Sequence, residues 1–233
     1  MHEDLAEPFP QPLRSSRLIV AAHAGEEVMG CGGLLAKHRD DAAVVVLVAP
    51  DERSVERLRT ARHLLGTPAY TFLGLPDVHL TDHLERIVTA LSTLIARVRP
   101  SELYLPYPSG HEDHAVAYEA GLRSTRRPVA RDAWSPVSVL VYDPHGADVT
   151  EYAADIRWGV GESLEESDID TKVAAAVAYG SPVARGLKRC AQDVGSARGL
   201  SWAEQFAVVR TSAVRDRGLT VSASVSMTAG ERR

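Results

Sequence analysis

Two short segments of the sequence carry side chains that could bind a metal ion. The first, HAGEE, begins at His23 and contains Glu26, and the second, HEDH, begins at His111 and ends at His114. In each segment two potential ligands are three residues apart, a spacing that places side chains on neighbouring positions of a helical turn. Two imidazoles and a carboxylate leave a coordination position open, the pattern of catalytic zinc, whose bound water has a pKa of about 7.

Each of these segments follows a predicted strand. Apolar runs rich in β-branched residues predict strands at RLIVAA, AAVVVLVA, AYTFLG, ELYLP and VSVLVYD. The clearest helix, TDHLERIVTALSTLIARV, has apolar residues at steps of three and four after a cap at Thr81 or Asp82, and Pro100 stops it. Since ligands of open α/β sheets bind outside the carboxyl ends of strands, the first and fourth strands are expected to bring the two segments together.

Near-continuous apolar strands that alternate with amphipathic helices predict a largely parallel sheet covered on both faces. The predicted fold is α/β, a Rossmann-like three-layer arrangement, with a single domain over residues 16–221. Residues 1–15 are expected to form a flexible arm and residues 222–233 a flexible tail. Beyond residue 145 we predict a strand at ADVTEYAADI, helices at TKVAAAVAY and VARGLKRCAQDV, and a last strand at WAEQFAVVR.

Composition narrows the class of partner and the compartment. The 233 residues carry a formal net charge of -5, which favours neither nucleic acid nor an anionic membrane, so the predicted partner is a small molecule. Cys31 and Cys190 are far apart and in no paired-ligand spacing, which predicts buried thiols in a reducing compartment. No secretory signal pattern and no run of about 18 apolar residues occurs, so we expect a cytoplasmic protein without a membrane span.

A dinucleotide site is the natural competitor for the first strand end, because Asp51 follows the second strand as an acid does in that fingerprint. Two features argue against it. Glu26 and Glu27 occupy the helix start where a pyrophosphate would bind, and the glycines of GCGG arrive about a turn too late.

Other polar residues receive weaker predictions. Single histidines are more often surface or hydrogen-bonded residues than ligands, and this applies to His38, His63, His79, His83 and His145. An arginine run could receive an anionic substrate group but is more typical of a solvated surface, and it comprises Arg123, Arg126, Arg127 and Arg131. Tyr107 and Tyr118 flank the second segment, where packing is the commoner use of a tyrosine.

Taken together, the segments resemble the motifs of the LmbE-like family of zinc-dependent N-deacetylases, also called the PIG-L family. That family's first motif, AHPDDE before a G-C-G-G-like helix start, stands here as AHAGEEVMGCGG. Its second motif, H-x-D-H, stands as HEDH, and LGLPD, TKVAAAVAYGSP and WAEQFAVVR are further echoes. The resemblance covers most of the chain.

The resemblance implies a role for each residue of the two segments. His23 and His114 would be zinc ligands, and Glu26 would take the place of the family's aspartate ligand, with one methylene more. His111 would stabilise the oxyanion or protonate the leaving amine, and Asp113 would orient it.

The resemblance further implies a zinc-dependent hydrolase that removes an acyl group, such as acetyl, from the amine of an amino sugar or related metabolite. The family's general base is the first aspartate of its motif, and here that position is Gly25. Since a positioned base contributes about 10² to 10⁴ in rate, zinc alone, Glu27 or a substrate group would have to compensate. The alternatives are another zinc-assisted reaction, ligand binding without turnover, or non-haem iron on the same ligands.

Overall fold

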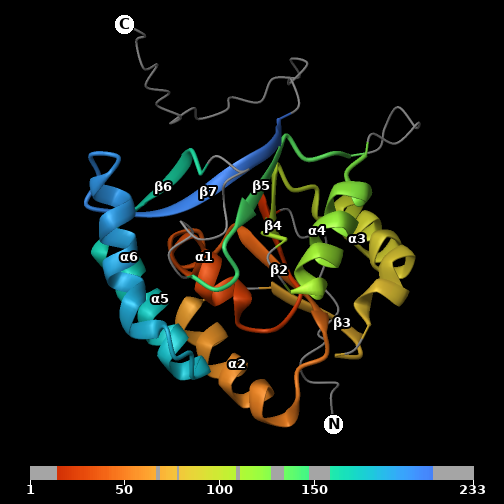
Figure 1. Cartoon of the computed structure of the whole chain (residues 1–233), viewed down its shortest axis with the longest axis horizontal. Coiled ribbons are helices and arrows are strands. Elements are labelled where there is room, and N and C mark those ends of the chain that lie inside the picture. The colour runs from red at the N-terminus through yellow and green to blue at the C-terminus, as the bar shows by residue number, and fades with distance from the viewer. Residues whose placement is uncertain are drawn as a thin grey trace, which may run out of the picture.

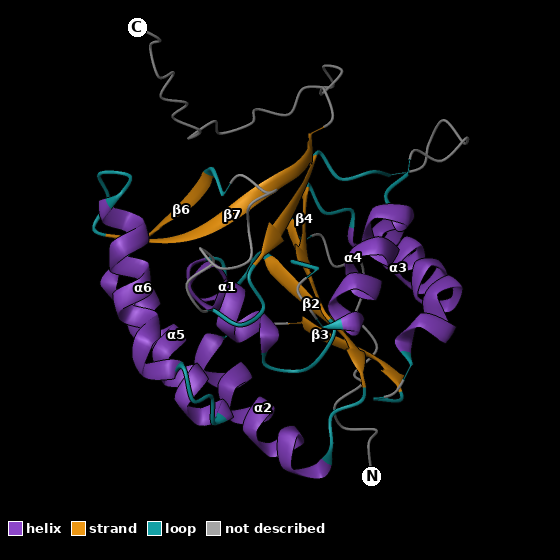
Figure 2. Ribbon diagram, viewed as in Figure 1, coloured by secondary structure: helices purple, strands orange, loops and turns teal. Residues whose placement is uncertain are grey.

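A computed structural model describes residues 15–66, 69–77, 79–108, 111–126, 134–146 and 158–211. They form one α/β domain in which a sheet lies between two sets of helices (Figures 1 and 2). The strands are β1 (Arg17–Ala21), β2 (Ala42–Val48), β3 (Ala69–Leu75), β4 (Glu102–Pro106), β5 (Ser138–Tyr142), β6 (Val160–Leu164) and β7 (Trp202–Thr211). The helices are α1 (Glu26–Lys37), α2 (Glu52–Leu65), α3 (Leu84–Val98), α4 (Glu112–Ser124), α5 (Glu166–Tyr179) and α6 (Ala184–Ser196), with a 3-10 turn, η1 (Leu80–His83), before α3.

Among the described residues the sheet has seven strands in the order β3-β2-β1-β4-β5-β7-β6. Strands β3, β2, β1, β4 and β5 pair in parallel, and β7 runs antiparallel to both β5 and β6. The chain moves outward from β1 to β3 and then returns to place β4 on the other side of β1. The carboxyl ends of β1 and β4 therefore border the point where the strand order reverses, the usual ligand position in such sheets. The predicted fold class is confirmed.

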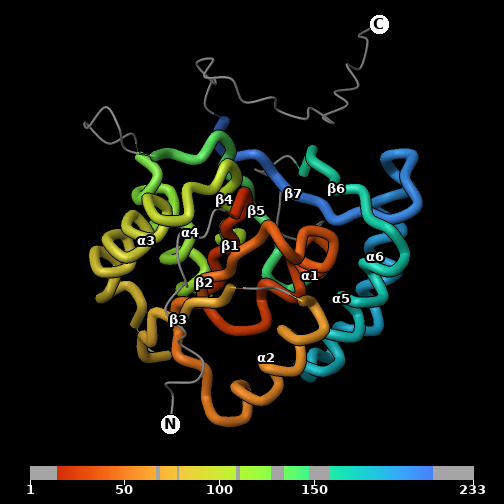
Figure 3. The backbone as a smooth tube through the Cα atoms, turned by 180° about the vertical axis from the view of Figure 1, so that it is seen from behind, coloured from red at the N-terminus to blue at the C-terminus, as the bar shows by residue number. Residues whose placement is uncertain are grey.

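Alternate residues of β1 pack into two separate hydrophobic cores, one on each face of the sheet. Ile19 and Ala21 of β1 pack in the core under α1, α2, α5 and α6, whereas Leu18 and Val20 pack in the core under α3 and α4. The same division of the helices is visible from behind in Figure 3. Because both faces are covered, β1 and β2 are buried almost throughout, which explains their unbroken apolar sequences.

The predicted helix after residue 80 differs at its start. Thr81 and Asp82 lie inside η1, and the cap position of α3 is His83, which makes no side-chain cap bond, so the predicted cap is wrong. Leu80 is fully buried, and its burial accompanies the tight turn that precedes the helix. The helix ends at Val98 as predicted, two residues before the proline.

The region beyond residue 145 follows the prediction in part. The helices at TKVAAAVAY and VARGLKRCAQDV lie within α5 and α6, and WAEQFAVVR lies within β7. Strand β6 was not predicted, because this edge strand is mostly half-exposed and lacks an apolar run. The predicted strand ADVTEYAADI falls outside the described residues, as do residues 1–14 of the predicted arm and the whole predicted tail. None of the helices in the described ranges has the length and apolar character that a membrane span needs.

Helix α1 lies close to its neighbours through its glycines. A Cβ atom on Gly32 would lie 2.7 Å from Cγ of Lys172, and one on Gly33 would lie 2.5 Å from Cδ1 of Leu164. A Cβ atom on Gly30 would meet the Tyr142 ring at 2.1 Å. The glycines of GCGG therefore serve helix packing rather than phosphate binding.

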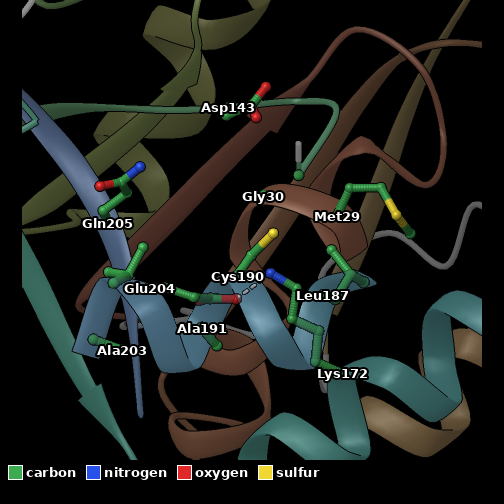
Figure 4. Close-up of a pocket in the computed structure, with 12 residues that line it drawn as sticks. Met29, Gly30, Asp143, Lys172, Leu187, Cys190, Ala191, Ala203, Glu204 and Gln205 are labelled. Atoms are coloured by element: carbon green, nitrogen blue, oxygen red, sulfur yellow. Dashed lines mark hydrogen bonds and ion pairs between the residues drawn. The ribbon is translucent and has the colours of Figure 1, made fainter. Parts of the chain in front are cut away.

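A buried ion pair supports the same helix. The carboxylate of Glu204 accepts hydrogen bonds of 2.7 Å from the N–H groups of Gly33 and Leu34. It accepts another of 2.7 Å from Nζ of Lys172 (Figure 4). The side chains of Lys172 and Glu204 are only 7% and 4% exposed. They border a small cavity that Cys190 also lines. Strand β7, helix α5 and helix α1 are thus joined through one carboxylate.

Candidate metal centre

The candidate ligands converge at the strand ends that border the topological switch. His23 lies two residues after β1, and Glu26 is the first residue of α1. His114 lies in the first turn of α4, the helix that follows β4. Because β1 and β4 pair in parallel, their following loops leave the same edge of the sheet.

One carboxylate oxygen faces both imidazoles. Oε1 of Glu26 lies 2.9 Å from Nδ1 of His23 and 2.8 Å from Nε2 of His114, and the ligand atoms of the three residues all lie within 4.8 Å of one another. The second oxygen, Oε2, accepts a hydrogen bond of 2.9 Å from the N–H of Ala22 and fixes the carboxylate. The structure thus brings together the three residues that the sequence indicated as metal ligands.

Electrostatics favour a cation at this point. Burial lowers the pKa of His23, but the hydrogen bond and charge of Glu26 and the charges of Asp77 and Asp113 raise it to about 9. Burial raises the pKa of Glu26, but hydrogen bonds from His114 and His23 lower it to about 2. A divalent cation can replace the proton between His23 Nδ1 and Glu26 Oε1, because metal ligands bind in their deprotonated forms. Two ring nitrogens and one carboxylate oxygen also form a donor set that suits zinc.

The other ring nitrogen of His23 is held by two aspartates. Nε2 lies 3.0 Å from Oδ1 of Asp77 and 3.2 Å from Oδ2 of Asp113. These acceptors favour a proton on Nε2 and leave Nδ1 as the candidate ligand atom, as carboxylates do beside many metal-bound histidines. Asp77 is not among the site residues predicted from the sequence, although it lies two residues after β3, where the strand-end rule could have found it.

His111 lies beside the ligands and is more open to solvent. Its side chain is 54% exposed, and its ring centroid lies 5.3 Å from that of His23 and 5.1 Å from that of His114. Nδ1 of His111 accepts a hydrogen bond of 3.4 Å from the N–H of Asp113, so His111 caps α4. The Asp113 carboxylate lies 4.0 Å from Nδ1 of His111, farther than from His23. Asp113 is thus placed to orient His23 through its carboxylate and His111 through its backbone.

A further histidine joins the site from a different strand end. The ring of His145 lies 5.3 Å from that of His114 and edge-on to it. His145 stands in the turn after β5, where its N–H donates to Oδ1 of Asp143 at 3.0 Å. His145 is predicted from the sequence to be a single surface or hydrogen-bonded histidine, since nothing nearby in the sequence connects it to the two motifs.

Glu27 points into the protein. Its side chain is fully buried, Oε2 accepts a hydrogen bond of 2.8 Å from the N–H of Gly25, and Oε1 accepts one of 3.3 Å from the hydroxyl of Tyr70. Burial raises the pKa of Glu27 to about 7, although the N–H groups of Glu27 and Gly25 oppose this. This placement favours a role in holding the first turn of α1 over the predicted role of proton acceptor.

The remaining sequence candidates lie elsewhere or have other partners. Asp51 caps α2 by accepting a hydrogen bond of 2.7 Å from the N–H of Ser54. Cys31 is buried in the core, where burial raises the pKa of its thiol. Arg123 pairs with Glu85 on α3, which fits the solvated-surface interpretation.

Two further candidates pack against apolar neighbours. Tyr107 lies against Trp158, with ring centroids 5.9 Å apart, and Tyr118 packs on the core under α3 and α4.

Residues 127 and 131 of the arginine run lie outside the described residues.

Comparison with known proteins connects this geometry to a family. The sequence profile of the family described as PIG-L, GlcNAc-PI de-N-acetylase, matches residues 18–125, which include both motifs. Among curated proteins, the sequence search finds no match.

Solved structures share the fold at low sequence identity. A conserved protein of Thermus thermophilus is 22% identical with a TM-score of 0.68, and the alignment covers 90% of this chain and 99% of that one. The N,N'-diacetylchitobiose deacetylase of Pyrococcus horikoshii is 16% identical with a TM-score of 0.65, covering 88% and 86%. A deacetylase of teicoplanin biosynthesis, solved in complex with teicoplanin, is 15% identical with a TM-score of 0.60, covering 82% and 97%.

Proposed function

We propose, from the premise that this chain belongs to the PIG-L family, that it is a zinc-dependent hydrolase which removes an acetyl group from the amine of an amino sugar or a related small metabolite. The observation that carries the proposal is the convergence of His23, Glu26 and His114 on one point at the switch of the sheet. Support for the reaction class comes from the fold shared with solved deacetylases, one of which acts on diacetylchitobiose.

Nδ1 of His23, the carboxylate of Glu26 and Nε2 of His114 would hold the zinc ion. Bound zinc polarises a carbonyl group and lowers the pKa of its water to about 7. Asp77 and Asp113 would keep the His23 ring in the required orientation and tautomer through Nε2. The N–H of Ala22 would do the same for the carboxylate of Glu26.

His111 would provide the proton donor for the reaction. Its Nδ1 accepts the N–H of Asp113, so the proton of the neutral ring lies on Nε2. The ring is half-exposed beside the candidate ligands, so the Nε2–H of its neutral form can donate a hydrogen bond to the oxygen of the tetrahedral intermediate, whereas proton transfer to the departing amine would need the imidazolium form.

The chain offers no carboxylate at position 25 to accept the proton of the attacking water. Glu27 is fully buried and bonded to Gly25 and Tyr70, so it does not substitute directly. Because a positioned base contributes about 10² to 10⁴ in rate, we expect slower turnover than in a relative that carries an acid there.

Acetate release tests the proposal. Zinc-loaded protein is incubated with a panel of N-acetylated glucosamine derivatives, next to a His114→Ala variant and a control variant, His63→Ala, whose histidine lies on the exposed face of α2. We expect His114→Ala to lose at least about 100-fold in rate and His63→Ala to keep the wild-type rate. A zinc-loaded chain that releases no acetate from any member of the panel would rule the hydrolase out.

The second candidate is a member of the same family that uses the metal for another reaction or binds a ligand without turnover. Gly25 favours it, since the turn holds φ +101 and carries no acid. A metabolite that co-purifies, or is altered without release of acetate, would support this candidate. Metal analysis of protein purified without added metal distinguishes zinc from iron.

A further inference from the structure

An aromatic ring lies where a side chain at position 25 would be. Tyr179 is the last residue of α5, and a Cβ atom built on Gly25 would lie 2.3 Å from Cε1, 2.6 Å from Cζ and 2.8 Å from Cδ1 of its ring. The phenol oxygen is one bond beyond Cζ. The Tyr179 side chain therefore fills the volume into which a side chain at position 25 would project.

Gly25 is required here for a second, independent reason. Its backbone has φ +101 and ψ -23, a left-handed conformation that L side chains rarely adopt. The carbonyl of Gly25 accepts the N–H groups of Val28 and Met29 at 3.0 Å, and its own N–H donates to Glu27. The turn thus begins α1 and is fixed by hydrogen bonds on both sides of the glycine.

The ring cannot easily move away. Tyr179 packs against the core under α1, α2, α5 and α6. The next residue, Gly180, is left-handed with φ +87, and its N–H donates to the carbonyls of Ala176 and Val177, which ends α5. A side chain at position 25 would have to displace a ring that packs on this core.

We infer that Tyr179 is a positioning residue of the candidate metal centre. Its ring packs against Gly25 and fixes the conformation of the turn that joins His23 to Glu26. The ring also excludes any side chain from position 25. The inference deepens the proposed function and rests on it only for the identity of the ligands. The inference also gives a steric reason for the absence of an acid at position 25. Position 25 is closed to an acid as long as Tyr179 is present, so Gly25→Asp alone does not restore a base.

A double-mutant cycle, measured by thermal unfolding of the metal-free chain, tests whether the Tyr179 ring excludes a side chain from position 25. We call this steric exclusion the interlock. Gly199→Ala is the control for backbone strain, because Gly199 has φ +71 and open space around it, and it should lower Tm by about 2 to 8 °C. Gly25→Ala should lower Tm by that amount plus about 2 to 12 °C from the clash with the ring. In a Tyr179→Ala background the additional loss should disappear. Effects of Gly25→Ala that are equal in both backgrounds would overturn the inference.

Cobalt(II) as a probe tests the positioning role. Tyr179→Phe keeps the ring and should leave the cobalt absorption spectrum and affinity as in the wild type. Tyr179→Ala frees the turn and should change the spectrum and weaken cobalt binding by about 10- to 100-fold, the usual effect of losing a support of a metal ligand. An unchanged spectrum and affinity in Tyr179→Ala would show that the ring does not position the ligands.

The two proposals can fail separately. The unfolding cycle needs neither metal nor substrate, so the interlock can hold in a chain that releases no acetate. If the chain is a hydrolase, Gly25→Asp with Tyr179→Ala should release acetate faster than Gly25→Asp alone when zinc saturates both variants. Equal rates for these two variants would count against the steric exclusion, whereas no release from any variant would count against the proposed hydrolase.

Discussion

Replacing Glu204 with glutamine tests whether a buried carboxylate holds the helix that carries the candidate ligand Glu26. The glutamine keeps the size of the side chain but removes the charge that faces Nζ of Lys172 at 2.7 Å. It also replaces one of the two oxygens that accept the N–H groups of Gly33 and Leu34 by an NH2 donor. The lysine is left without a carboxylate partner in a site where its side chain is only 7% exposed.

The expected loss is large because both partners are buried. Removing one partner of a buried ion pair costs about 3 to 5 kcal/mol. For a chain of this size each kcal/mol corresponds to about 2 to 4 °C in Tm, so Glu204→Gln should lower Tm by about 6 to 20 °C. The exposed pair of Glu166 with Lys188 provides a matched control, and Glu166→Gln should cost less than about 1 kcal/mol.

Differential scanning calorimetry of both variants at neutral pH measures the effect. A second variant separates the charge from the packing: Glu204→Leu combined with Lys172→Met removes both charges and should be more stable than Glu204→Gln. The reasoning is refuted if Glu204→Gln and Glu166→Gln lower Tm equally, because the burial of the pair would then have no energetic consequence.

Three further predictions concern the metal centre and pH. Asp113→Asn should weaken zinc binding about 10- to 100-fold in competition with a chromophoric chelator, since the acceptor for His23 Nε2 is impaired; an unchanged affinity would contradict that role. Zinc at 100 times its Kd should stabilise the chain by about 2.7 kcal/mol, or about 5 to 11 °C in Tm, and Glu26→Gln should abolish the shift; equal shifts in both proteins would exclude Glu26 as a ligand. Burial raises the pKa of Glu162, but hydrogen bonds from His38 and Lys37 lower it to about 2, so its contribution to stability is present above pH 4.5 and lost as the pH falls toward 2. Urea unfolding should therefore show Glu162→Gln less stable than the wild type at pH 6 and closer to it at pH 3, and a gap that widens at pH 3 would reverse the argument.

The sheet and the ligand set could be predicted because their signals are local. The apolar runs of β1, β2 and β4 reflect burial on both faces, and the 3.6-residue periodicity of α3 reflects burial on one face. The two motifs each follow a strand, so the general rule for ligand sites at strand ends predicted that they lie together. The choice of His114 over His111 as the second histidine ligand came from the family resemblance.

The residues that surround these ligands were not evident from local pattern. Asp77 and His145 stand shortly after strands, and Tyr179 lies in one of the segments that resemble the family, but nothing in the sequence shows which side chain of the site each of them approaches. Glu27 had the right chemistry and position for a base, yet its direction depends on the start of α1 and on Tyr70 of β3.

By itself the sequence determined the fold class, the strand ends and the residue types of the candidate metal centre, because hydrophobic periodicity and side-chain chemistry are properties of short segments. The tertiary structure decided which way each acid points and what fills the space at Gly25. Those outcomes depend on packing between helices and strands that are distant in the chain. The Tyr179 ring excludes a side chain at Gly25 only because α5 packs against α1, so no local sequence pattern could have predicted this exclusion.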